Sequence, residues 1–128
     1  MILPALLLAA AAPTEAAEPP SAGSLVLGGR TAAPSKTIAQ AALQEAVGFA
    51  ARSLKCGDVG GATASTMPKR WVPADPNFRI GPKGARYERW EIQACGRSER
   101  FLVVFWKDKK AGPQYQVGHP FPAEPAKP

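Results

Sequence analysis

The chain has little of what catalysis and metal binding most often use. Its 128 residues include one histidine and two cysteines, and His119 stands beside a proline near the C-terminus. A catalytic site requires a nucleophile, a base and a group that orients them, and a histidine in a proline-rich segment is poorly held for that role. Phosphate-binding loops, nucleophile elbows and close zinc-ligand spacings are also missing from the sequence. We therefore predict no catalytic residue, no metal site, no cofactor and no enzymatic activity.

Long apolar runs are scarce as well. The run Met1–Ala12 is shorter than the roughly 20 residues that span a bilayer. The run has the length of a signal peptide, and Ala9 and Ala11 fit the small-residue cleavage pattern. It does not contain the lysine or arginine that usually stands at the start of a signal peptide. We predict a signal peptide over residues 1–12 and a protein that is periplasmic or secreted and not transmembrane.

The two cysteines agree with export. In an oxidising compartment Cys56 and Cys95 are expected to form a disulfide, and closing a loop of about 40 residues is worth roughly 4 kcal/mol in the chain-entropy model. That contribution matters because a core this small is marginal. The alternative is two unrelated buried thiols.

Composition divides the rest of the chain. Residues 13–34 are rich in Ala, Pro, Gly and Ser and predict a flexible linker, with Leu25–Leu27 as an alternative short edge strand. Residues 119–128 hold four prolines and predict a tail. A small domain over residues 35–118 remains.

The domain begins with a predicted helix from Ser35 to Lys55. Ser35 follows a proline and suits the N-cap, and Gly57 stands where a C-terminal cap glycine is common. Apolar residues recur at three- and four-residue spacing and form one face of the helix: Ile38, Ala39, Ala42, Leu43, Ala46, Val47, Ala50 and Leu54.

A hairpin follows later in the chain. Residues 87–94 alternate between apolar and polar side chains, which is typical of a strand with one buried face. Residues 101–106 are apolar on both faces and predict a central strand that is covered on both sides. A tight connection at residues 96–98 joins them, and the expected core holds Trp90, Ile92, Phe101, Val103 and Phe105 with Leu43, Val47 and Leu54.

Further strands are predicted at residues 114–117 and, less clearly, at residues 62–67 or 77–80 between the prolines of a long loop. The sequence thus predicts an α+β fold. One amphipathic helix packs on a small antiparallel sheet of three to four strands, and one disulfide ties the helix end to the hairpin.

The hairpin also carries a resemblance. Trp90-Glu-Ile-Gln-Ala-Cys-Gly96 followed by Phe101–Phe105 resembles a W-x-[VI]-x-x-C-G element found in small, mostly uncharacterised exported proteins of Gram-negative bacteria. The resemblance spans 20 to 30 residues at most. It implies a disulfide-tied α+β domain of the periplasm and carries no activity.

Charge supplies the functional hypothesis. The chain has 16 Lys+Arg against 10 Asp+Glu, a net charge of +6. In an exported protein this balance favours an envelope protein or an anionic envelope surface as partner over nucleic acid, and plain solubility is the alternative. We therefore predict a non-catalytic cell-envelope protein that binds such a partner.

The alternative function is an inhibitor or ligand-binding module that uses the segment 69–89. Tryptophan beside lysine and arginine can bind anionic sugars or bases by stacking and charge. The candidate binding residues are Lys69, Arg70, Trp71, Arg79, Lys83, Arg86, Tyr87 and Arg89. A buried Trp71 among scattered charges indicates a structural role, whereas an exposed Trp71 in a basic hollow indicates ligand binding.

Overall fold

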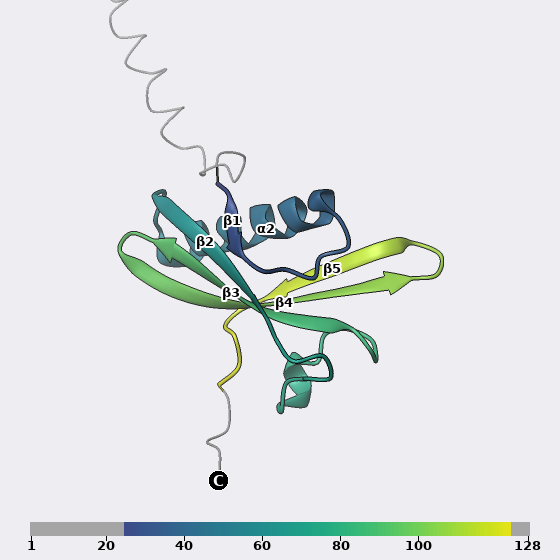
Figure 1. Cartoon of the computed structure of the whole chain (residues 1–128). Coiled ribbons are helices and arrows are strands. Elements are labelled where there is room, and N and C mark those ends of the chain that lie inside the picture. Colours follow the sequence, from purple (N-terminus) through teal and green to yellow (C-terminus); the bar gives the residue numbers. More distant parts are fainter. Residues whose placement is uncertain (1–24, 124–128) are drawn as a thin grey trace, which may run out of the picture.

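The computed structural model describes residues 25–123, in which a helix covers one face of a twisted sheet and an irregular loop covers part of the other (Figure 1). The sheet of this region has five strands in the order of the chain: β1 (Leu27–Gly29), β2 (Val59–Thr66), β3 (Arg86–Ala94), β4 (Arg97–Asp108) and β5 (Gly112–Gly118). β1 runs parallel to β2, and the other neighbours are antiparallel.

The α+β class is confirmed, but the sheet has five strands and is mixed, whereas three to four antiparallel strands were predicted. The additional strand is the short segment that composition assigned to the linker. Leu27 packs against the apolar core, which anchors this segment at the sheet edge beside Ala62. The predicted signal peptide, residues 1–12, lies outside the described residues, as does the first part of the predicted linker.

Helix α2 (Lys36–Leu54) starts as predicted, because the Ser35 hydroxyl accepts a hydrogen bond from the Ile38 amide at 3.1 Å. Its C-terminal end differs from the prediction. Lys55 takes the left-handed conformation, with φ of 53°, and its N–H turns back to the last helical carbonyls. Gly57 is therefore not the helix cap.

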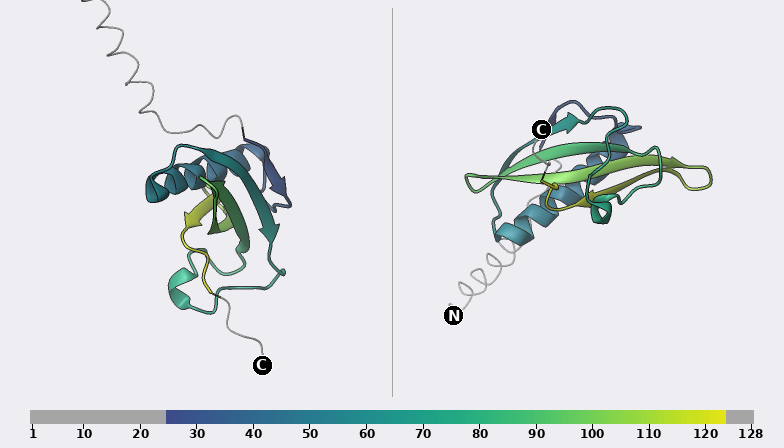
Figure 2. Two further views of the ribbon diagram at one scale, coloured as in Figure 1. Left: turned by 90° about the vertical axis from the view of Figure 1, so that its left-hand side faces the viewer. Right: turned by 90° about the horizontal axis from the view of Figure 1, so that it is seen from below.

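The face of α2 that lies on the sheet is largely alanine, so the helix backbone approaches the strands closely. The predicted core is confirmed for Leu43 and Val47 on the helix and for the strand residues Trp90, Ile92, Phe101, Val103 and Phe105, all at most 2% exposed. Leu54, in the last turn, is only partly buried. The helix lies against this face of the sheet (Figure 2), and residues of both belong to one apolar cluster.

A second, smaller apolar cluster lies on the opposite face of the sheet. It consists of Ala85, Tyr87, Leu102 and Val104, and the partly buried residues packed against it come from the loop between β2 and β3, from the end of β4 and from the C-terminal segment. The possible strand at residues 77–80 is absent from this loop. Pro76–Phe78 form a 3₁₀ turn instead, since Asp75 accepts a hydrogen bond from the Asn77 amide at 3.0 Å.

The segment after β5 is packed, although its composition predicted a tail from residue 119. His119 Nε2 lies 2.7 Å from Glu99 Oε1, and the His119 ring contacts the rings of Phe49 and Phe101. The Phe121 amide donates to the Arg100 carbonyl at 2.9 Å. The described domain therefore continues past residue 118, while residues 124–128 lie outside the described part.

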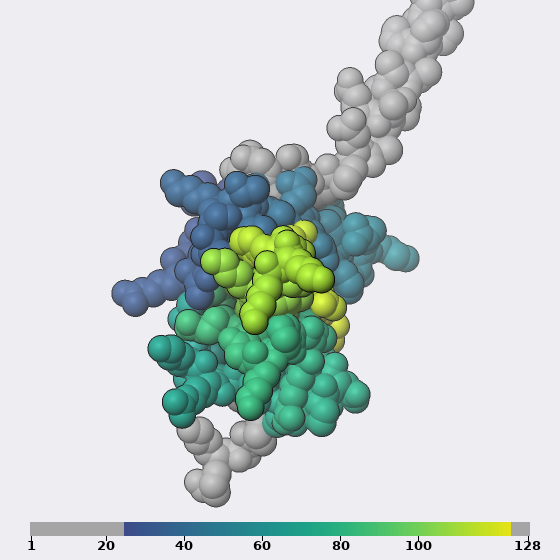
Figure 3. Space-filling model, turned by 90° about the vertical axis from the view of Figure 1, so that its right-hand side faces the viewer, coloured from purple at the N-terminus to yellow at the C-terminus, as the bar shows by residue number. Residues whose placement is uncertain are grey.

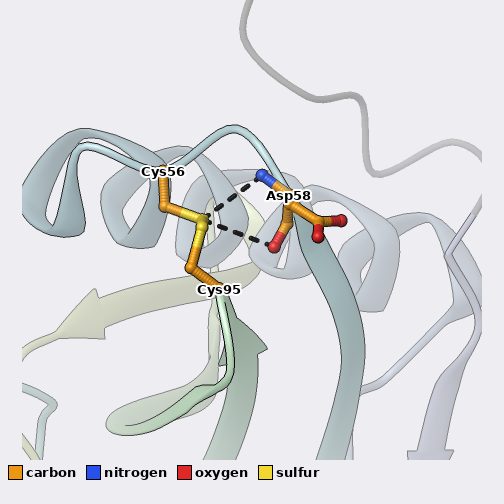
Figure 4. The surroundings of a disulfide bond; sticks show 3 residues. All are labelled: Cys56, Asp58 and Cys95. Carbon is orange, nitrogen blue, oxygen red and sulfur yellow. Dashed lines mark hydrogen bonds between the residues drawn. A yellow bond between two sulfur atoms is a disulfide. The ribbon is translucent and has the colours of Figure 1, made fainter.

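The turn between β3 and β4 is Cys95–Gly96, with φ of 50° and 74°, one residue earlier than expected. This is the two-residue geometry that matches strand twist. Cys95 is joined to Cys56 as predicted, with Cα atoms 6.1 Å apart (Figure 4). Asp58 between the helix and β2 supports the junction, because its amide donates to Cys56 Sγ at 3.3 Å and its carbonyl accepts from the Cys95 amide at 3.0 Å.

Phe101→Ala is expected to lower the free energy of unfolding by about 3–5 kcal/mol, because the ring is fully buried and its removal leaves a cavity. Chemical denaturation measures the effect. Arg100→Ala, an exposed neighbour on the same strand, is the control and should change stability little. Equal midpoints for the two variants would contradict the core assignment.

Because Cys56 and Cys95 form a disulfide, the unreduced protein should have no thiol that an alkylating reagent can modify. Reduction should raise the intact mass by two hydrogens. Cys56→Ser/Cys95→Ser is expected to lose roughly 4 kcal/mol of stability, since the bond restricts the unfolded chain. Alkylation of both cysteines without reductant would refute the disulfide.

Candidate functional site

The loop between β2 and β3 packs closely against the face of the sheet that lies opposite helix α2. A Cβ added at Gly81 would lie 2.8 Å from the side chains of Ala85 and Val104. The next residues form a tight turn, in which the Ala85 amide donates to the Pro82 carbonyl at 3.1 Å and Gly84 has φ of 89°. The turn leaves the Lys83 side chain exposed above the sheet.

Trp71 is fixed within the same loop. Its ring stacks on Phe121, with an interplanar angle of 14° and a centroid distance of 5.7 Å, and meets Tyr87 edge to face. The indole remains partly exposed, so it is neither the fully buried nor the fully exposed tryptophan of the two sequence hypotheses. Trp71 therefore packs against Phe121 and Tyr87 and still leaves part of its ring accessible to a ligand.

The accessible side of Trp71 lines a hollow of about 360 Å³, here called the Trp71 pocket. Three exposed cationic side chains surround it, and Val72, which is 49% exposed, adds an apolar wall. The lining residues are Lys69, Arg70, Trp71, Val72, Lys83, Gly84 and Ala85. The pocket therefore offers an apolar floor with positive charge at its rim.

Two more hollows continue from the Trp71 pocket along the same end of the sheet. The middle hollow, of about 310 Å³, is lined by Ala32, Pro34, Pro82, Lys83, Gly84, Ala85, Arg86, Phe105, Trp106 and Lys107. The hairpin hollow, of about 420 Å³, is lined by Pro82, Trp106, Lys107, Asp108, Lys109 and Lys110. In Figure 3 the β4–β5 hairpin projects toward the viewer directly above the atoms of the β2–β3 loop.

Positive charge dominates this end of the molecule. The three hollows together hold seven cationic residues, Lys69, Arg70, Lys83, Arg86, Lys107, Lys109 and Lys110, against the single carboxylate of Asp108. None of the seven takes part in the ion pairs formed among residues 25–123, which involve Arg97, Arg100 and His119. Uncompensated cations around a hollow attract an anionic ligand.

The structure brings together five of the eight candidate residues: Lys69, Arg70, Trp71 and Lys83 at the Trp71 pocket and Arg86 in the middle hollow. Tyr87 lies beneath Trp71 and is 4% exposed. Its position makes it a support for the pocket floor.

Arg79 and Arg89 line none of these three hollows. Arg79 holds the loop together, because Nε donates to the Pro73 carbonyl at 2.8 Å and Nη2 to the Ala74 carbonyl at 3.2 Å. Arg89 lies farther along β3, paired with Leu102. Neither position supports direct ligand contact.

Sequence reasoning missed the contribution of the β4–β5 hairpin. Trp106 was assigned to a central strand that is covered on both sides, but Trp106 and Lys107 line two of the hollows, and Lys109 and Lys110 line the hairpin hollow. The signal was available, since Trp106-Lys107 repeats the pairing of an aromatic with a cation seen at Arg70-Trp71.

A buried carboxylate was also missed. Glu88 is 0% exposed and lies on the helix-facing side of β3, the same side as Trp90 and Ile92. Its two oxygens accept hydrogen bonds from the Ala32 amide and from the Trp90 indole, the latter at 2.8 Å. These bonds tie the β1–α2 connection to the sheet, which assigns Glu88 a structural role.

Tyr115, on the side of the sheet that faces the helix, has a shifted pKa. Burial raises the pKa of the Tyr115 hydroxyl above its usual value, and the charge and hydrogen bond of Glu45 raise it further. Tyr115, on β5, pairs with Phe105 of β4 and does not line the three hollows.

Comparisons with known proteins leave the site to be interpreted from its own geometry. No family model, no curated protein and no solved structure matches the chain. In the described range 25–123, no helix is long and apolar enough to cross a membrane, and His, Cys, Asp and Glu form no group of three that could hold a metal ion.

Replacement of Glu88 by leucine is expected to lower the free energy of unfolding by about 2–6 kcal/mol, since two buried N–H donors lose their acceptor at roughly 1–3 kcal/mol each. Urea denaturation provides the measurement. Glu91→Leu, on the opposite face of the same strand, is the matched control. If both variants lose stability equally, the Glu88 hydrogen bonds are not the cause.

Proposed function

We propose that this protein is a non-catalytic binding module of the cell envelope, exported and disulfide-bonded, that recognises an anionic ligand carrying a flat or apolar ring in the Trp71 pocket. The observation that carries the proposal is the convergence of Lys69, Arg70 and Lys83 around the partly exposed indole. An apolar floor fixes the ring of a ligand, and a few polar groups at the rim give it orientation and specificity.

The rigid walls of the Trp71 pocket also support a binding function. Trp71 stands on Phe121 and Tyr87, and the turn that carries Lys83 is closed by its own hydrogen bond. A preformed pocket spares the ligand the entropic cost of ordering a loop. Binding residues on loops held by a rigid scaffold are a common arrangement.

The proposed absence of catalysis rests on how the titratable side chains are used. Glu88 accepts two hydrogen bonds in the core, and His119 is held between Glu99 and two phenylalanine rings. Neither residue lines the three hollows. The proposed exported location is supported by the Cys56–Cys95 bond, since such bonds persist in oxidising compartments.

The test is calorimetric titration of the protein with a sulfated tetrasaccharide, a short anionic ligand with ring surfaces. Lys69→Glu/Lys83→Glu should weaken binding by at least about tenfold, because it reverses charge at the pocket rim. Raising the salt concentration should weaken wild-type binding, since exposed charges are screened within about 8 Å at physiological ionic strength.

The control is Lys36→Glu/Arg97→Glu, which makes the same change in net charge at exposed positions outside the three hollows. It should bind the tetrasaccharide almost as wild type does. Equal losses in the two double variants, or binding that is indifferent to salt, would defeat the proposal. Circular dichroism confirms that each variant is folded.

A further inference from the structure

The Trp71 pocket and the two hollows beside it share their walls. Lys83, Gly84 and Ala85 line both the Trp71 pocket and the middle hollow. Pro82, Trp106 and Lys107 line both the middle hollow and the hairpin hollow. A residue that lines two hollows lies between them, so the three adjoin one another in a row from the β2–β3 loop to the β4–β5 hairpin, and this row is here called the depression.

Each section of this depression repeats the same chemistry. An indole lies in the Trp71 pocket, and a second, the partly exposed Trp106, lies in the middle and hairpin hollows. Cationic side chains accompany both indoles: Lys69 and Arg70 at one end, and Lys109 and Lys110 at the other. A ligand that matches this pattern is itself repetitive, with alternating ring and negative charge.

We propose that the depression binds a linear polyanionic polysaccharide over its whole length, with the Trp71 pocket and the β4–β5 hairpin holding different sugar units of one chain. This proposal rests on the proposed function and extends it, because it names the ligand class and adds Trp106, Lys107, Lys109 and Lys110 to the site. The apolar face of a sugar ring packs on part of an indole, while sulfate, phosphate or carboxylate groups meet the lysines.

The walls of the depression argue against an extended peptide. A peptide bound as an added strand needs free backbone donors and acceptors at a sheet edge. Here Pro34 and Pro82 have no N–H to offer, and the Ala85 N–H is already bonded within the turn. These three positions cannot donate a backbone hydrogen bond to an added strand.

The shape and the packing of the rings argue against two other partners. A lipid surface is flat, whereas the Trp71 pocket is a hollow of about 360 Å³. A nucleic-acid base stacks best on an open aromatic face. Phe121 stacks on Trp71 and Tyr87 meets its ring edge to face, so the indole is only partly exposed and its contact with a ligand ring is limited.

The experiment compares ligands of one chemistry and two lengths. Wild-type protein is titrated with sulfated tetrasaccharide and decasaccharide of the same repeating unit. The decasaccharide should bind at least about tenfold tighter per molecule, because units that are linked engage the second half of the site at high effective concentration. Equal affinities would overturn the proposal.

Substitutions then show which residues provide the higher affinity for the decasaccharide. Lys109→Glu/Lys110→Glu should remove most of the additional affinity for the decasaccharide and change tetrasaccharide binding little, because both lysines are exposed in the hairpin and do not line the Trp71 pocket. The charge-matched Lys36→Glu/Arg97→Glu should keep the length dependence. If both double variants weaken the decasaccharide equally, general charge attraction explains the result and the site is not continuous.

The ligand class is tested by competition. A single-stranded oligonucleotide and a poly-glutamate peptide of the same charge as the decasaccharide should displace it only weakly. Displacement as strong as by unlabelled decasaccharide would overturn the polysaccharide assignment. Tetrasaccharide binding that ignores Lys69→Glu/Lys83→Glu would defeat the proposed function itself, and this result is distinct from the loss of length dependence alone.

Discussion

Strand β4 imposes the constraint on which the structure depends, because both of its faces are apolar. One face carries Phe101, Val103 and Phe105, and the other carries Leu102 and Val104. A strand of this kind is stable only when each face is removed from water. Helix α2 covers the first face. The β2–β3 loop and the C-terminal segment cover the second, so an irregular loop takes the place that a second helix or sheet occupies in larger domains.

This division explains why the candidate site lies where it does. An irregular cover closes the surface less completely than a helix and leaves hollows where the loop meets the sheet. The close passage at Gly81 and the turn at Lys83 press the loop onto β4, while the β4–β5 hairpin extends beyond it. Trp71, Ala85 and Trp106 belong to the apolar cluster around Val104 and also line the depression, so stability and binding share these residues.

Local patterns made the regular elements predictable from sequence. The Ser35 cap, the alanine-rich face of α2 and the alternation through Trp90 reflect neighbours within a few positions, and the structure confirms them. Contacts between distant residues had a weaker signal or none. Leu27, which the sequence offered only within an alternative edge strand, joins the sheet beside Ala62, and Glu88 is buried where the Ala32 amide and the Trp90 indole donate to it. The candidate site was predictable in part for the same reason. Its residues between 69 and 86 are close together in sequence, whereas Trp106 joins them only when the chain folds.

The Cys56–Cys95 bond closes a ring of chain, 39 residues from one cysteine to the other, that contains β2, the β2–β3 loop and β3. The exposed basic residues of the loop, among them Lys69 and Arg70, are natural cleavage points for proteases that recognise lysine and arginine. A cut there opens the ring but does not divide the molecule, since both fragments remain attached through the cystine. In an environment rich in proteases, a nicked copy would keep helix α2 and the central hairpin covalently joined, and only reduction would release them.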